Sequence, residues 1–167
     1  MTQAMDDRQI QRDRMRYIKN KSSSRLCYLG ILLNVLYFIS IYKSDVGTWY
    51  YQILVGGSIV YNLLFMLMTF LASEGVKNYQ VSFSVLLYVL GALQAARIFI
   101  LPLQAHNAVV TVNGAQTTVM GDAQFIRVVI YLAGSAVCLI AAAVINQRKA
   151  AALSSHLASL ETGKEAA

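Results

Sequence analysis

Four long apolar stretches constrain what this chain can fold into. They cover approximately residues 26–42, 49–72, 81–103 and 124–145. A helix needs ~20 mostly apolar residues to cross the hydrocarbon core of a bilayer, and these stretches are of that order. Outer-membrane barrels consist instead of short strands with alternating hydrophobicity. We therefore expect an all-α membrane protein, a bundle of four transmembrane helices.

The composition favours the same class. The chain is 57% hydrophobic and 13% charged, whereas a soluble domain has about 25% charged residues. So few charged side chains leave a large excess of apolar surface, for which lipid is the expected solvent.

The basic residues are distributed unevenly along the chain. Seven of the fourteen Lys and Arg residues lie in the first 25 positions, and the loop 104–123 contains none. Basic segments flanking transmembrane helices stay in the cytoplasm. We therefore expect a multi-pass protein of the plasma (inner) membrane with both termini cytoplasmic. Lys43, in the first outer turn, is a minor exception.

These patterns divide the chain into a basic cytoplasmic arm (1–24), a four-span domain (25–146) and an amphipathic cytoplasmic tail (147–167). The apolar stripe of the tail consists of Ala150, Leu153, Leu157 and Leu160. In the arm, Arg8, Arg12 and Arg16 recur at helical spacing, and each could contribute up to ~1 kcal/mol to binding anionic lipid headgroups. The alternative is that the arm is a solvated topology signal.

Local signals indicate where the helices begin and end. Ser22, Ser23 and Ser24 can cap the start of the first helix with their hydroxyls. Gly75 follows the second stretch and is expected to cap its C-terminal end. Pro102 is expected to mark the end of the third.

The loop 104–123 contains a hairpin pattern. Val109–Val112 and Gln116–Val119 flank Asn113–Gly114, and an Asn-Gly pair supplies the positive φ angles of a type I′ turn. The sequence therefore predicts a short extracytoplasmic β-hairpin between the third and fourth spans. An isolated hairpin is only marginally stable in water, so it needs support from the bilayer, the helix ends or another subunit.

Five polar side chains lie within the apolar stretches and are candidate site residues: Asn34, Asn62, Gln94, Arg97 and Arg127. One interpretation is a substrate path, because ionisable and polar groups inside a membrane often serve function. The alternative is helix packing, because amides form hydrogen bonds between helices at about 0.6 kcal/mol each.

The two arginines allow two further interpretations. Arg97 and Arg127 are expected at similar depth near the outer interface, where together they could form an anion-recognising pocket. Alternatively, each side chain extends to the interface or forms an ion pair that ties helix ends together. The expected outer partners in such ion pairs are Asp45 and Asp122.

Residue types that carry chemistry are scarce in the spans. His106 and His156 lie outside the four stretches, and no Asp or Glu lies within one. We find no spacing typical of a metal site and no phosphate-binding or nucleophile motif. We therefore expect no catalytic residue, no cofactor and no metal, and a protein that is not an enzyme.

The leading functional hypothesis is a non-catalytic integral membrane subunit or accessory protein of a larger membrane complex, such as a transporter or respiratory assembly. The alternative is a small homo-oligomeric transporter or channel, with a polar path lined by Asn34, Asn62, Gln94 and Arg97. The expected partners are anionic lipids and other membrane subunits, or further copies of the chain. Nucleic acid is not expected, because the basic residues cluster beside a span.

Overall fold

The computed structural model describes residues 19–42, 52–112 and 115–165. Within them the long helices are α2 (Lys21–Tyr42), α4 (Gln52–Lys77), α5 (Val81–Ile100) and α7 (Asp122–Glu165). The short elements between α5 and α7 are α6 (Pro102–Asn107), β1 (Val109–Val112) and β2 (Ala115–Thr118). In this described part of the chain, four helices are long and apolar enough to cross a membrane, as expected.

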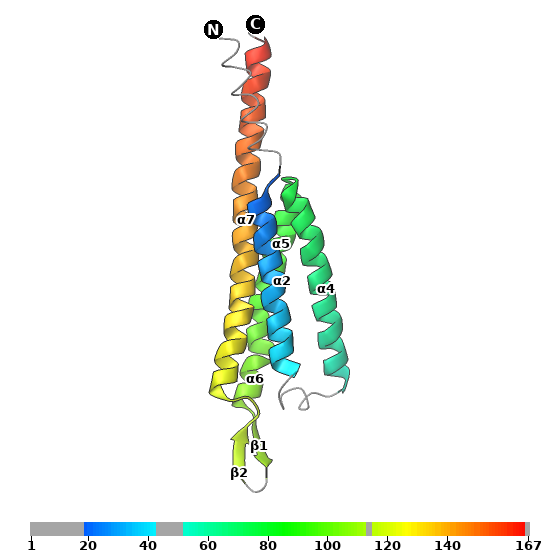
Figure 1. Ribbon diagram of the computed structural model, residues 1–167, viewed down its shortest axis with the longest axis vertical. Coiled ribbons are helices and arrows are strands. Elements are labelled where there is room, and N and C mark those ends of the chain that lie inside the picture. Colours follow the sequence, from blue (N-terminus) through cyan, green and yellow to red (C-terminus); the bar gives the residue numbers. More distant parts are fainter. Residues whose placement is uncertain (1–18, 43–51, 113–114, 166–167) are drawn as a thin grey trace.

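The four helices form an elongated bundle (Figure 1). Helix α7 packs against both α2 and α5, whereas α4 packs mainly against α2 and α5 and hardly touches α7. The start of α2 and the C-terminal end of α7 lie at one end of the molecule, and the hairpin projects from the other end (Figure 1). In this view α4 diverges from α2 toward the hairpin end.

Apolar side chains fill the interior and also cover the outside. One buried cluster, which includes Cys27 and Leu139, lies toward the end where α2 starts, and a second includes Ile41 and Leu132. Outside, large apolar side chains such as Phe99 (64% exposed) point away from the bundle. Apolar surface of this extent is costly in water and favourable in lipid, so the surface is compatible with a multi-pass membrane protein.

Gly75 does not cap α4, contrary to the prediction from sequence. It lies inside the helix, which ends at Lys77. A Cβ atom at this position would lie 2.1 Å from Cδ2 of Phe83 on α5, so glycine is required for the close approach of the two helices. The reversal of the chain instead uses Tyr79, whose φ of 61° lies in the left-handed region.

The start of α2 also differs from the prediction. The side chain of Asn20, not a serine, accepts a hydrogen bond from the backbone N–H of Ser23 (3.4 Å). Ser23 and Ser24 are buried within the helix. The Ser23 hydroxyl accepts from Nδ2 of Asn20 at 2.8 Å, and the Ser24 hydroxyl contacts α4 as described below. An asparagine oxygen is as good an N-cap acceptor as a serine hydroxyl, so propensity alone did not distinguish them.

The two strands of the expected hairpin are present, apart from its turn, which lies outside the described residues. Helix α5 ends at Ile100 and Pro102 opens α6, which leads into β1. Strands β1 and β2 are antiparallel, and Val112 pairs with Ala115. This register leaves Asn113–Gly114 as the connection, although these two residues lie outside the described part. Strand β2 begins one residue earlier than expected.

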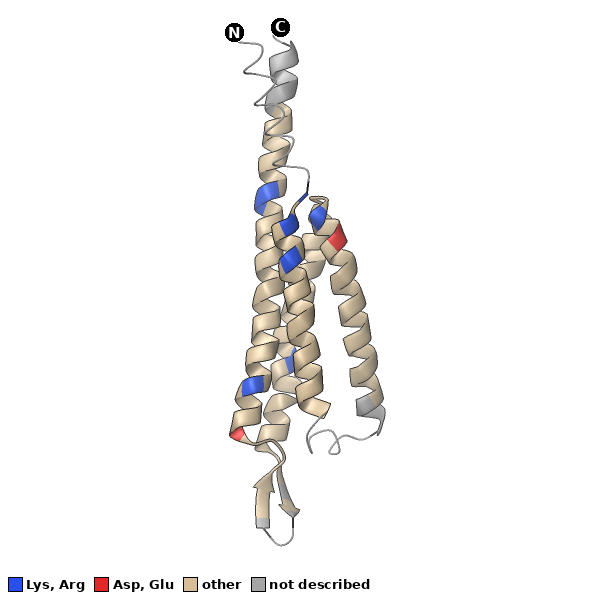
Figure 2. Cartoon of the chain, viewed as in Figure 1, with Lys and Arg blue, Asp and Glu red and all other residues tan. Residues whose placement is uncertain are grey.

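Helix α7 is much longer than the other three. Its 44 residues correspond to about 66 Å at ~1.5 Å per residue, against ~30 Å for the hydrocarbon core of a bilayer. The part of α7 that follows Lys149, which still contacts Asn20 beside the start of α2, extends beyond the bundle (Figure 1). Figure 2 shows several Lys and Arg residues near the start of α2, the end of α4 and the adjoining part of α7, whereas most of the bundle between its two ends carries no charge.

Candidate functional site

Buried and half-buried polar side chains from all four long helices meet toward the hairpin end of the bundle. We call this set the Arg97 cluster. Its members are Asn34 from α2, Ser58 and Asn62 from α4, Gln94 and Arg97 from α5, and Ser135 from α7. Arg97 is the seventeenth of the twenty residues of α5, so it lies about 24 Å along that helix from its start.

The guanidinium of Arg97 is held mainly by two amide oxygens. Nη1 donates to Oδ1 of Asn62 at 2.9 Å and to Oδ1 of Asn34 at 3.4 Å. Nη2 donates to the hydroxyl of Ser58 at 3.4 Å. The arginine side chain thus connects α5 to both α2 and α4, and it is only 8% exposed.

Two tyrosine rings also contact the guanidinium. Its central carbon lies 4.5 Å from the ring centroid of Tyr37 and 4.7 Å from that of Tyr61. A cation this close to an aromatic face gains about 0.5–2 kcal/mol, the larger values applying where water is excluded. The rings offset part of the cost of burying the charge without neutralising it.

No carboxylate among the described residues neutralises Arg97. Glu74 pairs with Lys77 at 2.9 Å, and Asp122 lies 3.9 Å from His106. Asp45 lies outside the described residues. A charged side chain at the centre of a membrane costs at least ~2.5 kcal/mol, and an uncompensated buried charge is therefore the feature of this cluster that most requires an explanation.

Several polar atoms in and beside the cluster lack a hydrogen-bond partner within the described structure. These buried atoms are the hydroxyls of Tyr37 and Tyr61 and Oε1 of Gln94. A buried polar group without a partner costs about 1–3 kcal/mol. The cluster therefore has unused donors as well as an unused acceptor.

Helix spacing and small residues bring the cluster together. Gln94 precedes Arg97 by three positions and donates from Nε2 to Oδ1 of Asn34 at 2.9 Å and to the hydroxyl of Ser135 at 3.4 Å. Ser135 in turn donates to the backbone oxygen of Gly30 at 2.9 Å. A Cβ at Gly30 would lie 3.1 Å from Leu139, so glycine allows α2 and α7 to approach closely here.

The structure thus joins the four residues that the sequence named as a possible path. Asn34, Asn62, Gln94 and Arg97 form one connected network, completed by a bond from Nδ2 of Asn34 to Oδ1 of Asn62 (3.2 Å). The sequence also places Ser58 on the face of Asn62, because it precedes Asn62 by one helical turn, whereas Ser135 was missed.

Other candidate residues lie elsewhere. The prediction that Arg97 reaches outward or shares a pocket with Arg127 was wrong, because Arg97 points into the bundle whereas Arg127 is exposed on α7. Asp122 is exposed, with His106 beside it and not an arginine. Asp45, Arg8, Arg12 and Arg16 lie outside the described residues.

A second set of polar contacts closes the opposite end of the bundle and was missed from sequence. Asn146 on α7 donates from Nδ2 to the hydroxyl of Ser84 (2.8 Å) and to the backbone oxygen of Gln80 (3.1 Å). Its Oδ1 accepts from Nδ2 of Asn20 at 3.1 Å, and Lys149 donates to Oδ1 of Asn20 at 3.2 Å.

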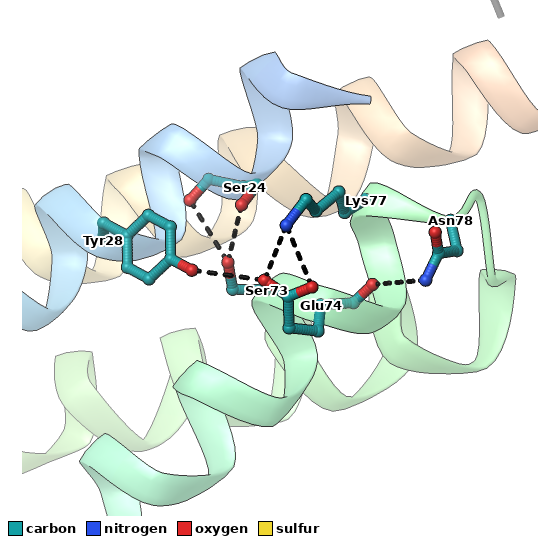
Figure 3. A network of polar contacts seen from close by, with 6 residues as sticks. All are labelled: Ser24, Tyr28, Ser73, Glu74, Lys77 and Asn78. Carbon is teal, nitrogen blue, oxygen red and sulfur yellow. Dashed lines mark hydrogen bonds and ion pairs between the residues drawn. The ribbon is translucent and has the colours of Figure 1, made fainter. Parts of the chain in front are cut away.

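Contacts between α2 and α4 complete this end of the bundle (Figure 3). The hydroxyls of Ser24 and Ser73 lie 2.8 Å apart, and Tyr28 donates to Glu74 at 3.3 Å. Glu74 also accepts from Lys77 on its own helix. Every donor here has an acceptor, so these contacts have a structural role.

The remaining chemistry of the described residues is limited. Among them no group of three or more His, Cys, Asp or Glu side chains is placed to hold a metal ion. Comparison of the chain with protein-family models, with curated proteins and with solved structures found no match. The Arg97 cluster is therefore the candidate site on the strength of its own geometry.

Proposed function

We propose that this chain is a non-catalytic integral subunit or accessory protein of a larger complex in the plasma (inner) membrane, with both termini cytoplasmic. The single observation that carries the proposal is the length of α7. Its last sixteen residues, 150–165, form about 24 Å of helix that extends past the other three helices and offers a rigid arm on which a partner can dock.

The surface of this arm supports docking. Leu157 is 51% exposed although it lies in the part of α7 farthest from the bundle, and Leu153 on the same stripe is half-buried. An exposed leucine outside the apolar bundle gains free energy when a partner helix covers it. Most of the neighbouring positions from Ala150 to Ala158 are exposed or half-buried as well.

The hairpin offers a second attachment point at the other end of the molecule. Its base is closed by a hydrogen bond from Val119 to the backbone oxygen of Ala108 at 2.9 Å, and Nδ1 of His106 on α6 lies 3.3 Å from the backbone oxygen of Met120. Val109 in β1 is nevertheless 59% exposed. A two-stranded sheet with free edges readily pairs with another strand.

Purification from the native membrane in mild detergent tests this function. The full chain should co-purify with other membrane chains in fixed stoichiometry, and a chain that ends at Lys149 should lose them while its bundle stays folded. A matched control replaces exposed Ser154 and Ser155 by alanine in the full-length arm and should keep the partners. Recovery of a lone 18.4 kDa chain or of a pure homo-oligomer would refute the proposal.

A second candidate function is a small homo-oligomeric transporter or channel. The observation in its favour is the convergence of Asn34, Asn62, Gln94 and Arg97 on one buried network. Flux across reconstituted vesicles tests it: Gln94→Leu and Arg97→Leu should abolish transport in protein that still folds. Absence of flux from the wild-type protein would exclude this candidate.

A further inference from the structure

We propose that the Arg97 cluster binds a phosphate group, supplied either by a phospholipid headgroup or by free inorganic phosphate. The inference starts from the charge of Arg97, which is buried to all but 8% and has no carboxylate partner among the described residues. It is independent of the proposed role as a subunit, because it concerns the isolated chain.

The geometry of the guanidinium points to an oxyanion with two oxygens. Nη1 is occupied by Asn34 and Asn62, whereas the edge formed by Nε and Nη2 carries a single long hydrogen bond, from Nη2 to Ser58 at 3.4 Å. Two parallel N–H groups on one edge match the oxygens of a phosphate or carboxylate. The edge that best recognises such a group is thus the one with the weakest protein contact.

The surrounding side chains add donors of the right kind. The buried hydroxyls of Tyr37 and Tyr61 have no hydrogen-bond partner in the described structure, and their rings contact the guanidinium. A hydroxyl can donate to a phosphate oxygen, so a phosphate beside Arg97 would give these groups a partner. Such a ligand accounts for the buried charge and the unpartnered hydroxyls together.

The cluster is most open on the side of α4. Ser58 and Tyr61 are half-buried, and the preceding Gly56 and Gly57 are exposed. A Cβ built on either glycine would have no atom within 4 Å. Ser58 and Tyr61 are thus the partly exposed contacts of the guanidinium, and a ligand is expected to approach from their side.

One source is a lipid headgroup in the leaflet at the hairpin end. Arg97 lies ten positions, about 15 Å of helix, before the hairpin end of the apolar stretch Val81–Asn107, and Ser58 lies six positions, about 9 Å, after the start of α4 at Gln52. A headgroup phosphate would therefore have to enter below the interface of that leaflet to meet the guanidinium. Free phosphate in the adjoining water is the other source.

Three probes added to the purified, delipidated full chain in mild detergent test the proposal. They are phosphatidylglycerol, diacylglycerol with the same acyl chains, and inorganic phosphate. Native mass spectrometry should show a stoichiometric phosphatidylglycerol adduct, accompanied by a rise in melting temperature, and no comparable diacylglycerol adduct. If inorganic phosphate binds saturably, free phosphate is a sufficient source. If phosphatidylglycerol binds and inorganic phosphate does not, the source is the lipid headgroup. Equal binding of diacylglycerol and phosphatidylglycerol, without binding of inorganic phosphate, would overturn the proposal.

Matched variants assign the binding to this cluster. Arg97→Gln should lose roughly thirtyfold or more in affinity, whereas Arg127→Gln, which removes an exposed arginine from α7, should bind as the wild type does. Affinity of Arg97→Gln within a factor of about three of the wild-type value would overturn the proposal.

Asn62→Asp provides a second test if Arg97→Gln fails to fold. This near-isosteric change places a carboxylate where Oδ1 of Asn62 now accepts from Nη1 at 2.9 Å. The internal carboxylate should stabilise the protein without a ligand and reduce phosphate affinity; unchanged affinity would contradict the proposal. Asp45→Asn addresses a carboxylate that follows the end of α2 by three residues in the sequence. If Asp45→Asn destabilises the chain as Arg97→Gln does, and the wild type binds no probe, then Asp45 neutralises Arg97 and the proposal fails.

Discussion

Nη1 of Arg97 donates a 2.9 Å hydrogen bond to Oδ1 of Asn62 and thereby joins α5 to α4 inside the bundle. Asn62 is held in turn, because its Nδ2 donates to the backbone oxygen of Ser58 at 2.8 Å. The amide therefore presents its oxygen, not its nitrogen, to the arginine. This orientation turns an amide in an apolar helix into an acceptor for a buried cation.

Replacing Asn62 by leucine should destabilise the bundle. The leucine fills a similar volume, but it leaves Nη1 of Arg97 with only the longer bond to Asn34, and an unsatisfied buried donor costs ~1–3 kcal/mol. Thermal unfolding in detergent should show a lower midpoint for Asn62→Leu. Leu63→Ala, at a 59% exposed position on the outer face, serves as the control and should change the midpoint little. An unchanged midpoint for Asn62→Leu would show that this bond contributes nothing to stability.

Replacing Gly75 by alanine should also destabilise the protein, because the new methyl group overlaps the ring of Phe83. The nearest ring atoms are 2.1 and 2.3 Å from the Cβ position, and overpacking of this kind costs ~1–3 kcal/mol. Phe83→Ala removes the ring that the new methyl group would overlap. Gly75→Ala should therefore lower the free energy of unfolding less in the Phe83→Ala background than in the wild type. Gly57→Ala, where the Cβ meets no atom within 4 Å, should be neutral or gain up to ~1 kcal/mol from helix propensity. Equal effects of the two alanine substitutions would argue against the close approach of α4 and α5.

Replacing Asn146 by leucine should loosen the end of the bundle where α2 begins. The change removes the donor to Ser84 and Gln80 and the acceptor for Asn20, all in a fully buried position. We expect the free energy of unfolding to fall by ~1–3 kcal/mol or more, because the former partners of Asn146 would stay buried without that hydrogen bond. Hydrogen exchange should accelerate in the first turn of α2 more than in α5 near Arg97. Ser154→Ala, whose hydroxyl bonds only to its own helix, is the control; uniform acceleration along both helices would contradict a local role.

Sidedness can be checked by labelling with a membrane-impermeant maleimide in intact cells. In a background of Cys27→Ala and Cys138→Ala, a cysteine at Thr111 in the exposed hairpin should react from outside. A cysteine at Ser155 on the extended part of α7 should react only after the membrane is opened. These outcomes follow from the basic arm, which is expected to stay in the cytoplasm, and from the position of the two sites at opposite ends of the molecule (Figure 1). The reverse labelling pattern would invert the proposed topology.

Stretches governed by local composition were predicted well. The four spans followed from the lengths of the apolar runs, and the hairpin followed from Asn113–Gly114 between two β-prone segments. The polar residues of the candidate site could also be named, because an asparagine or arginine is conspicuous in an apolar run. Their mutual distances could not, since the rotation of each helix about its axis depends on all of its neighbours.

Gly75 and Arg97 show where local reasoning fails. A glycine after an apolar run is typical of a helix cap, but here the proximity of Phe83 on the next helix decides its role. An arginine near the end of a span is expected to extend toward water, but two amide oxygens and two tyrosine rings provide acceptors inside the bundle.

The sequence by itself determined the class of protein, the number of apolar helices and the residues that a lipid environment makes conspicuous, because each depends on side chains close together along the chain. Only the tertiary structure decided that α4 and α5 meet at Gly75 and that Arg97 turns inward. Both outcomes depend on packing between helices, where a single methyl group or one accepting oxygen on a neighbouring element changes which arrangement has the lower free energy.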